Sequence, residues 1–178
     1  MTDPRFTPAL ITATQASHRK FYPYGPFVSI TLAQWAVESN WGRAESGRNN
    51  YFGIKATQTQ IDTGHATQRW TKEYLHGQYR TMNLYFADYD TLQDGIDAHA
   101  QLLISHHYLP CMRAPTPEAY AEALHQCGYA TAPNYAPVLI GVITANNLKQ
   151  FDQVFDRPMA IKSGTLTPNA PGDIPAVI

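Results

Sequence analysis

Residues 33–56 read AQWAVESNWGRAESGRNNYFGIKA, and the apolar helix that runs into this stretch decides the fold. Apolar residues follow the spacing i, i+4, i+7 and i+8 of one helical face, namely Val28, Leu32, Trp35 and Ala36. Further apolar residues widen that face, so the pattern predicts a central, largely buried helix over residues 27–39. Gly42 closes the segment.

Glu38 lies near the carboxyl end of this predicted helix, a position that a carboxylate normally avoids. The helix dipole disfavours a negative charge there, and apolar neighbours penalise the charged form, so both effects raise the expected pKa. General-acid cleavage of a glycosidic bond requires a carboxylic acid that keeps its proton near neutral pH. The alternative is a glutamate on a solvated helix face that shares hydrogen bonds with Gln34.

On either side of the central helix, the sequence predicts further helices and one β-hairpin. Thr7 as N-cap and Pro8 at the first helical position predict a helix over residues 7–20. The segments QRWTKEYL and QYRTMNLYF alternate in polarity and are separated by His76-Gly77, which is typical of a hairpin. Later helices are expected over residues 90–106, 116–128 and 133–150.

Local signals set the ends of these later helices. Asp90 with Gln93 resembles a capping box, and Gly128 is expected to end the helix over residues 116–128. Pro133 is expected at the first position of the last helix. The predicted fold class is therefore α+β: a mostly helical domain with a small β-hairpin lobe and a cleft between the lobes.

We expect a single domain over residues 1–156. Beyond Arg157 the sequence is rich in Pro and Gly and has no periodicity, which predicts an extended or flexible tail over residues 157–178. The formal net charge of −1 argues against a nucleic-acid-binding protein. No apolar run approaches the roughly 20 residues of a membrane span, and the N-terminus does not read as a secretory signal peptide.

Five motifs in order resemble those of the bacterial cell-wall glucosaminidases, glycoside hydrolase family 73, of the lysozyme-like superfamily. They are Glu38-Ser39-Asn40-Trp41-Gly42, the segment NYFGIK at residues 50–55, Thr71-Lys72-Glu73, the segment FADY at residues 86–89, and the segment CGYATAPNYA at residues 127–136. The resemblance implies an endo-β-N-acetylglucosaminidase that cuts the β-1,4 bond between N-acetylglucosamine and N-acetylmuramic acid in peptidoglycan. We expect neither a cofactor nor a metal.

The resemblance also implies roles for particular residues. Glu38 is the catalytic acid, Glu73 a second carboxylate on the β lobe, and Tyr129 a tyrosine that orients the intermediate. The remaining motif residues are expected to bind substrate, namely Trp41, Asn50, Phe52, Tyr89 and Tyr135. A separation of about 5–5.5 Å between the two carboxyl groups predicts retention and about 6.5–9.5 Å inversion, whereas a wider gap suggests substrate assistance or a mobile lobe.

Two positions depart from the family pattern. Cys127 stands where the family has Ala, and Ala132 replaces an Asp that looks like an N-cap of the last helix. Losing such a cap typically costs about 0.5–2 kcal/mol. Cys111 and Cys127 do not make a disulfide scaffold, but one bridge between them is open in an oxidising compartment.

Other readings stay open at this point. The four side chains that suggest a zinc site are His99, His106, His107 and Cys111, but no H-E-x-x-H motif is present. Cys127 with His125 offers the residue types of a thiol peptidase. A muramidase of the same fold, or a module that binds glycan without cutting it, also fits the sequence.

The expected partner is the peptidoglycan glycan strand, so the expected place of action is the cell wall, in the periplasm of a target cell. The resemblance implies three routes to the wall that need no signal peptide: flagellar export, phage-encoded lysis or tail entry, and injection into a rival cell as an antibacterial toxin. Our hypothesis is the last, a secreted effector delivered to rival bacteria. Such an effector requires a cognate inhibitor protein that occupies the cleft.

Overall fold

The computed structural model describes residues 1–75, 78–130 and 132–152, and of residues 73–75 it describes the backbone alone. Glu73, as a side chain, and the predicted tail over residues 157–178 therefore lie outside the described part. The elements, in chain order, are α1 (Pro8–Lys20), α2 (Val28–Glu38), α3 (Gln58–Asp62), β1 (Ala66–Leu75), β2 (Gln78–Ala87), α4 (Leu92–Leu103), the 3₁₀ turn η1 (His106–Tyr108), α5 (Leu109–Met112), α6 (Pro117–Gln126), α7 (Tyr135–Ala145) and the 3₁₀ turn η2 (Leu148–Phe151).

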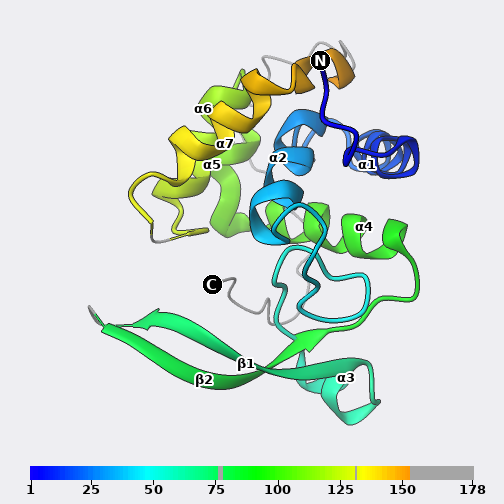
Figure 1. The fold of residues 1–178 in the computed structure, drawn as a ribbon, viewed down its shortest axis with the longest axis vertical. Helices are drawn as coiled ribbons and strands as arrows, with labels where there is room; N and C mark the ends of the chain where they lie inside the picture. Colours follow the sequence, from blue (N-terminus) through cyan, green and yellow to red (C-terminus); the bar gives the residue numbers. More distant parts are fainter. Residues whose placement is uncertain (76–77, 131, 153–178) are drawn as a thin grey trace.

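The predicted α+β class is confirmed by a helical body and a two-stranded antiparallel sheet (Figure 1). Helix α2 is the centre of the body, because α1, α6, α7 and η2 all pack against it. Its residues from Val28 to Ala36 are all buried. Apolar residues are spread around most of the helix, and such a helix must be covered by other elements on most of its sides, which explains the burial.

The β-hairpin packs mostly on itself and projects below the helical body in Figure 1. Its base is held by the loop before it, because Ala56 donates to the Tyr85 carbonyl and Ala87 donates to the Ile54 carbonyl. Phe86 and Ala87 are buried there, whereas the first four residues of β2 are exposed. The hairpin is thus an arm that is anchored at one end.

Helix α1 begins as the sequence predicts. The Thr7 side chain accepts a hydrogen bond from the Leu10 amide, and a proline occupies the first turn. Thr116 caps α6 in the same way, and Gly128 follows its end with a φ of 74°. The predicted start of α1 at a threonine cap and the predicted end of α6 before Gly128 are therefore confirmed.

The predicted boundaries of α4 and α7 are wrong at both ends, since α4 ends at Leu103 and α7 at Ala145, earlier than the predicted residues 106 and 150. The capping box of α4 is Thr91 with Asp94, one residue later than predicted, because Thr91 has the extended backbone that lets its hydroxyl reach the Asp94 amide. Helix α7 begins at Tyr135, not at Pro133, and its N-cap is Asn134. Ala132 therefore does not occupy the cap position that the missing aspartate was expected to fill.

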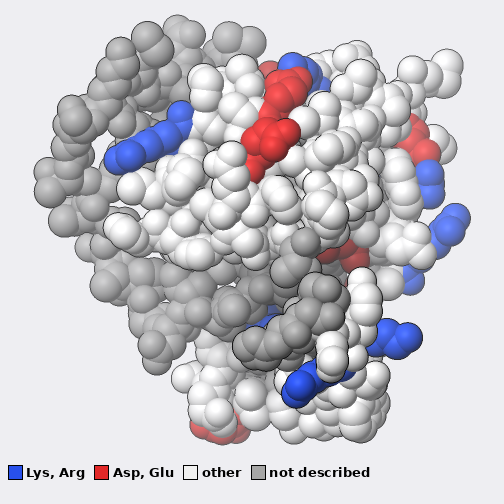
Figure 2. All heavy atoms as spheres, turned by 90° about the vertical axis from the view of Figure 1, so that its left-hand side faces the viewer, with Lys and Arg blue, Asp and Glu red and all other residues white. Residues whose placement is uncertain are grey.

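Most of the described surface in Figure 2 is uncharged, and its Lys, Arg, Asp and Glu side chains are scattered. Within the described ranges, none of the helices combines the length and the apolar character that crossing a bilayer requires.

Candidate active site

The turn that ends α2 fixes where Glu38 lies. The Ser39 hydroxyl donates to the Trp35 carbonyl and accepts from the Gly42 amide at 2.7 Å. Asn40, Trp41 and Gly42 all have positive φ, so the chain reverses tightly within three residues. A Cβ on Gly42 would lie 2.5 Å from the Trp35 ring. The motif that the sequence singled out is thus, first of all, a helix-ending turn with Glu38 as its last helical residue.

Glu38 accepts a hydrogen bond from a tyrosine that lies 97 residues later in the sequence. The Tyr135 hydroxyl donates to Glu38 Oε1 at 2.8 Å and accepts from Gln34 Nε2 at 3.0 Å. Gln34 lies one helical turn before Glu38 on α2, and Tyr135 is the first residue of α7. The close packing of α2 with α7 therefore builds the site.

Burial raises the pKa of the Glu38 carboxyl to about 7, and the hydrogen bond from Tyr135 opposes that rise. The side chain as a whole is nevertheless exposed to solvent. The Glu38 carboxyl is therefore partly desolvated by the surrounding protein atoms, while the residue remains accessible to solvent. Glu38 can therefore hold a proton near neutral pH and still be reached from outside, which is what a general acid needs.

An aromatic stack continues from Tyr135 into the protein. Its ring stacks on Tyr129 at 5.8 Å between centroids, Tyr129 meets His99 edge-on at 6.2 Å, and His99 stacks on Phe52 at 3.9 Å. Tyr129 and His99 are both buried, and no hydrogen-bond partner is found for their polar side-chain atoms among the described residues. Sequence reasoning missed His99 as a neighbour of the site, because only tertiary packing brings α4 to Tyr129.

The predicted substrate-binding residues Asn50 and Phe52 lie inside the protein. The Asn50 amide donates to the Ile54 and Ala87 carbonyls, and its oxygen accepts from the Ile54 amide. Asn50 thereby ties the loop after α2 to the end of β2. Direct substrate contact does not fit the burial of either residue, since Asn50 is fully enclosed and Phe52 is 1% exposed.

Trp41 and Tyr89 are partly buried near the same loop. Trp41 packs on Phe6 at 5.6 Å, and the Arg5 guanidinium lies 3.9 Å from the centre of its ring. Burial raises the pKa of Tyr89 to about 12. The Tyr89 backbone accepts from Arg48 and Asn49 side chains. In the described structure both residues support the frame of the site, and their contact with substrate stays a prediction.

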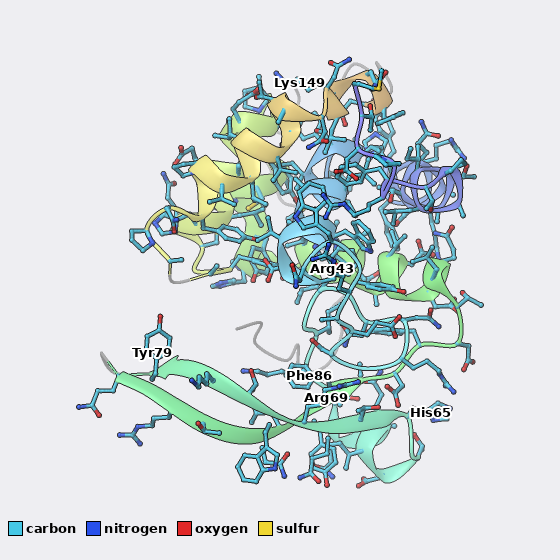
Figure 3. The ribbon with its side chains drawn as sticks, viewed as in Figure 1. Arg43, His65, Arg69, Tyr79, Phe86 and Lys149 are labelled. Carbon is cyan, nitrogen blue, oxygen red and sulfur yellow. The ribbon has the colours of Figure 1, made fainter. Side chains whose placement is uncertain are left out.

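The hairpin carries the second predicted carboxylate. Residue 73 lies on β1, where its backbone pairs with Arg80 of β2. Among the described side chains, Arg69 donates to the Ser46 carbonyl at 2.7 Å and fastens β1 to the loop after α2. Figure 3 shows Tyr79 near the free end of the hairpin and Phe86 at its anchored base.

A family model described as mannosyl-glycoprotein endo-β-N-acetylglucosaminidase matches residues 15–148, a range that contains Glu38, Tyr129 and Tyr135. The chain belongs to this glucosaminidase family. The predicted resemblance is confirmed, and with it the assignment of the domain to the glycoside hydrolases.

Curated relatives in this family can be aligned with most of the chain. The exo-glucosaminidase LytG of Bacillus subtilis is 33% identical over 139 residues, which cover 74% of this chain and 48% of LytG. The peptidoglycan hydrolase FlgJ of Salmonella typhimurium is 36% identical over 121 residues, which cover 64% of this chain and 38% of FlgJ. The chain thus spans less than half the length of these curated relatives.

A solved structure confirms the fold of this family member. The catalytic domain of the autolysin Auto from Listeria monocytogenes superposes with a TM-score of 0.68 at 31% sequence identity. The match covers 81% of this chain and 84% of that domain.

Proposed function

We propose that the domain hydrolyses the β-1,4 bond between N-acetylglucosamine and N-acetylmuramic acid in peptidoglycan, with Glu38 as general acid. The observation that carries the proposal is the Glu38 carboxyl, which keeps a proton near neutral pH, is open to solvent and is held by Tyr135. The names of the relatives, a glucosaminidase and a peptidoglycan hydrolase, support the bond class.

In this mechanism protonated Glu38 donates its proton to the glycosidic oxygen as the bond to the anomeric carbon breaks. The carboxylate that remains accepts the hydrogen bond from Tyr135, which stabilises the charged form. Water then supplies the hydroxyl of the new reducing end, and its proton returns to Glu38 or goes to a second base.

Glu73 is the proposed second carboxylate, and its role rests on the motif Thr71-Lys72-Glu73. The anomer released in the first seconds, followed by proton NMR, distinguishes retention from inversion. Glu73→Gln is expected to lower kcat, while Glu122→Gln, a change at an exposed glutamate on α6, is expected to leave kcat unchanged. Equal rates for both variants would remove Glu73 from the mechanism and favour participation of the substrate's own N-acetyl group. Tyr129 was expected to orient that intermediate, but it is 1% exposed, so direct contact with the substrate does not fit its burial.

The decisive test is digestion of purified peptidoglycan by the wild type, Glu38→Gln and Glu122→Gln, with mass spectrometry of the fragments. N-acetylglucosamine at the new reducing end, released by the wild type and Glu122→Gln but not by Glu38→Gln, is the expected result. We expect Glu38→Gln to lose at least about 10²-fold in rate, the lower bound for losing a general acid. Full activity of Glu38→Gln would refute the assignment of the acid.

Muramidase activity is the second candidate function. A probable N-acetylmuramidase of Lactococcus lactis is 30% identical over 135 residues. A related sequence is thus named for cleavage of the other glycosidic bond of the same polymer, the one on the far side of N-acetylmuramic acid. N-acetylmuramic acid at the new reducing end would establish it. Retention of the glycan on the protein without any release would instead favour a binding module.

Delivery into a rival cell, and a cognate inhibitor protein that occupies the site, remain predictions from the sequence. Peptidoglycan lies outside the cytoplasmic membrane, so a hydrolase acting as an effector should harm a host only from the periplasm. Expression of the chain in each compartment of one host tests this, with Glu38→Gln as the control. Equal growth in both compartments would exclude the effector role.

A further inference from the structure

Gln34 is a fully buried amide in the middle of α2, between the apolar residues Ala33 and Trp35. Its side-chain nitrogen donates to the Tyr135 hydroxyl at 3.0 Å. Burying an amide costs free energy that its hydrogen bonds only offset, so an apolar side chain of the same length would serve packing at least as well. Core packing therefore does not explain a glutamine at this position.

The contact with Gln34 fixes the direction of the Tyr135 hydroxyl. A tyrosine hydroxyl has one hydrogen, whereas an amide nitrogen has two hydrogens and does not accept. The hydrogen between Gln34 and Tyr135 therefore belongs to Gln34, which leaves the single hydrogen of Tyr135 for Glu38 Oε1, 2.8 Å away. Gln34 makes no hydrogen bond to Glu38 itself within the described part of the chain. Its effect on the acid is therefore expected to pass through Tyr135.

We propose that Gln34 is a positioning residue, which holds the Tyr135 hydroxyl as a donor to Glu38 and strengthens that hydrogen bond as the acid gives up its proton. A hydroxyl that accepts one hydrogen bond becomes a better donor in the next, so the two bonds reinforce each other. The carboxylate gains more from this chain than the neutral acid does, because a charged acceptor forms the stronger hydrogen bond. The inference rests on the proposed role of Glu38 as general acid and names a residue that acts on it indirectly.

Glu38 is the group of this cluster that changes charge near neutral pH. Burial raises the pKa of Tyr129 and of Tyr135 well above the ordinary tyrosine value. Behind them, burial raises the pKa of Tyr108 to about 12 and lowers the pKa of His99 to about 3. Burial and the hydrogen bond from Tyr135 account for the pKa of Glu38, without a contribution from a neighbouring charge. A titration around neutral pH therefore follows this one carboxyl.

The test measures the pKa of Glu38 directly, by carbon NMR of protein labelled at the glutamate carboxyl carbons, between pH 4 and 9. Glu38→Gln assigns the signal, because it removes it. Gln34→Met keeps the length of the side chain without the amide, and we expect it to raise the pKa of Glu38 by about 0.3–0.6. Thr31→Val is the matched control. It removes another buried polar group of α2, a hydroxyl that donates to the Phe27 carbonyl, and should leave the pKa unchanged.

A double variant decides whether Gln34 acts through Tyr135. Tyr135→Phe alone should raise the pKa of Glu38 by more than Gln34→Met does, since it removes the donor itself. Adding Gln34→Met to Tyr135→Phe should change the pKa no further, because the hydroxyl on which Gln34 acts is gone. A merely structural role for Gln34 would lower the midpoint of thermal unfolding of Gln34→Met. We expect that midpoint to stay equal or to rise, because the variant buries no amide.

Turnover of peptidoglycan gives an independent readout. In Gln34→Met we expect kcat at pH 6 to be about two- to fourfold lower with KM unchanged, and the alkaline limb to move to higher pH. The NMR titration does not depend on hydrolysis. A wild type that releases no glycan would refute the proposed function, whereas the titration would still decide whether Gln34 acts on Glu38.

A fall in the pKa of Glu38 in Gln34→Met would overturn the proposal. It would mean that the amide is reversed, so that its oxygen accepts from Tyr135 and draws the hydrogen away from Glu38. An unchanged pKa would overturn it as well, and so would a rise of the same size in the Tyr135→Phe background. Gln34→Leu, a second apolar replacement, is judged by the same criteria should Gln34→Met not fold.

Discussion

The chemistry of Glu38 follows from one conflict between its neighbours. Crowding by protein atoms favours the neutral acid, while the Tyr135 hydroxyl favours the carboxylate, and the balance leaves the pKa at about 7. A pKa close to the working pH lets one group donate a proton and take it back. Catalysis that requires the protonated acid should decline as pH rises through about 7.

The same shift predicts how stability depends on pH. The pKa of Glu38 is raised on folding from 4.5, so its stabilising contribution is fully present below pH 4.5 and is lost as pH rises through about 7. Glu38→Gln resembles the protonated acid at every pH. Its midpoint of unfolding should equal that of the wild type at pH 4 and exceed it at pH 8. Because solvent reaches the side chain, the gain should stay below about 1 kcal/mol. Thermal scans between pH 4 and 9 measure it, and a gap that is constant with pH would contradict the assigned pKa.

Tyr135→Phe separates the hydroxyl of Tyr135 from its ring. The ring can still stack on Tyr129, but the Glu38 carboxylate loses a donor, so the pKa of Glu38 rises further. The alkaline limb of kcat/KM should therefore move to higher pH. Gln34 loses its acceptor, and the free energy of unfolding should fall by about 1–2 kcal/mol. Tyr24→Phe, at an exposed tyrosine, is the control. An unmoved alkaline limb would show that Tyr135 does not tune the acid.

At the scale of elements, the turn after α2 predicts an unusually severe effect of one methyl group. Gly42→Ala places a Cβ at a φ of 74° and 2.5 Å from the Trp35 ring. Gly64→Ala is a matched control, because Gly64 has the same φ and nothing within 4 Å of the added atom. The control should lose about 1–2 kcal/mol of unfolding free energy through backbone strain. Gly42→Ala should lose more, through the clash, and should also lower kcat, since this turn places Glu38. Chemical denaturation and peptidoglycan release measure the two effects, and equal losses in both variants would rule out the clash.

Elements differ in how well their sequences predict them. Helix α2 could be predicted because its apolar residues repeat at helical spacing, and α1 and α6 because a threonine caps each one. The start of α7 could not, because its N-cap Asn134 makes no side-chain cap bond and Pro133 gave a competing local signal. Helix α3 was missed, since five residues carry no periodicity, although Thr57 and Gln60 form a capping box that could have located it.

At the scale of the whole molecule, contacts between distant residues complete the site. A local pattern was enough to single out Glu38, but its partner Tyr135 lies 97 residues away, and only packing of α2 on α7 joins them. For the same reason Asn50 and Phe52 could be recognised as motif residues, while their burial, Asn50 against the end of β2 and Phe52 against His99 of α4, could not be foreseen. Motif spacing along the chain therefore predicts which residues matter better than it predicts what each one touches.

The two ends of the described chain also meet in the body of the protein. Thr2 and Asp3 bond to Asn146, and η2 lies beside the N-terminal segment in Figure 1. Next to η2, the Asp152 carboxylate accepts from the amide and the hydroxyl of Ser29 at 2.8 and 2.7 Å. Ser29 lies in the first turn of α2, whose N-cap Phe27 makes no side-chain cap bond. Asp152, 123 residues later in the sequence, thus acts as the N-cap of α2 and places a negative charge at the positive end of the helix dipole.

The contact between Asp152 and Ser29 predicts that the domain ends close to residue 152. Asp152→Ala leaves the Ser29 hydroxyl and amide without their acceptor, so the free energy of unfolding should fall by about 1–3 kcal/mol. Removal of residues 157–178 should leave it unchanged, because the Pro/Gly-rich sequence there predicts no packed element. Urea denaturation of the full chain, the truncated chain and Asp152→Ala compares the two changes directly. A truncated chain that loses as much stability as Asp152→Ala would show that the domain extends past residue 156. A fully stable Asp152→Ala would show instead that α2, the helix that carries Glu38, needs no cap from the far end of the chain.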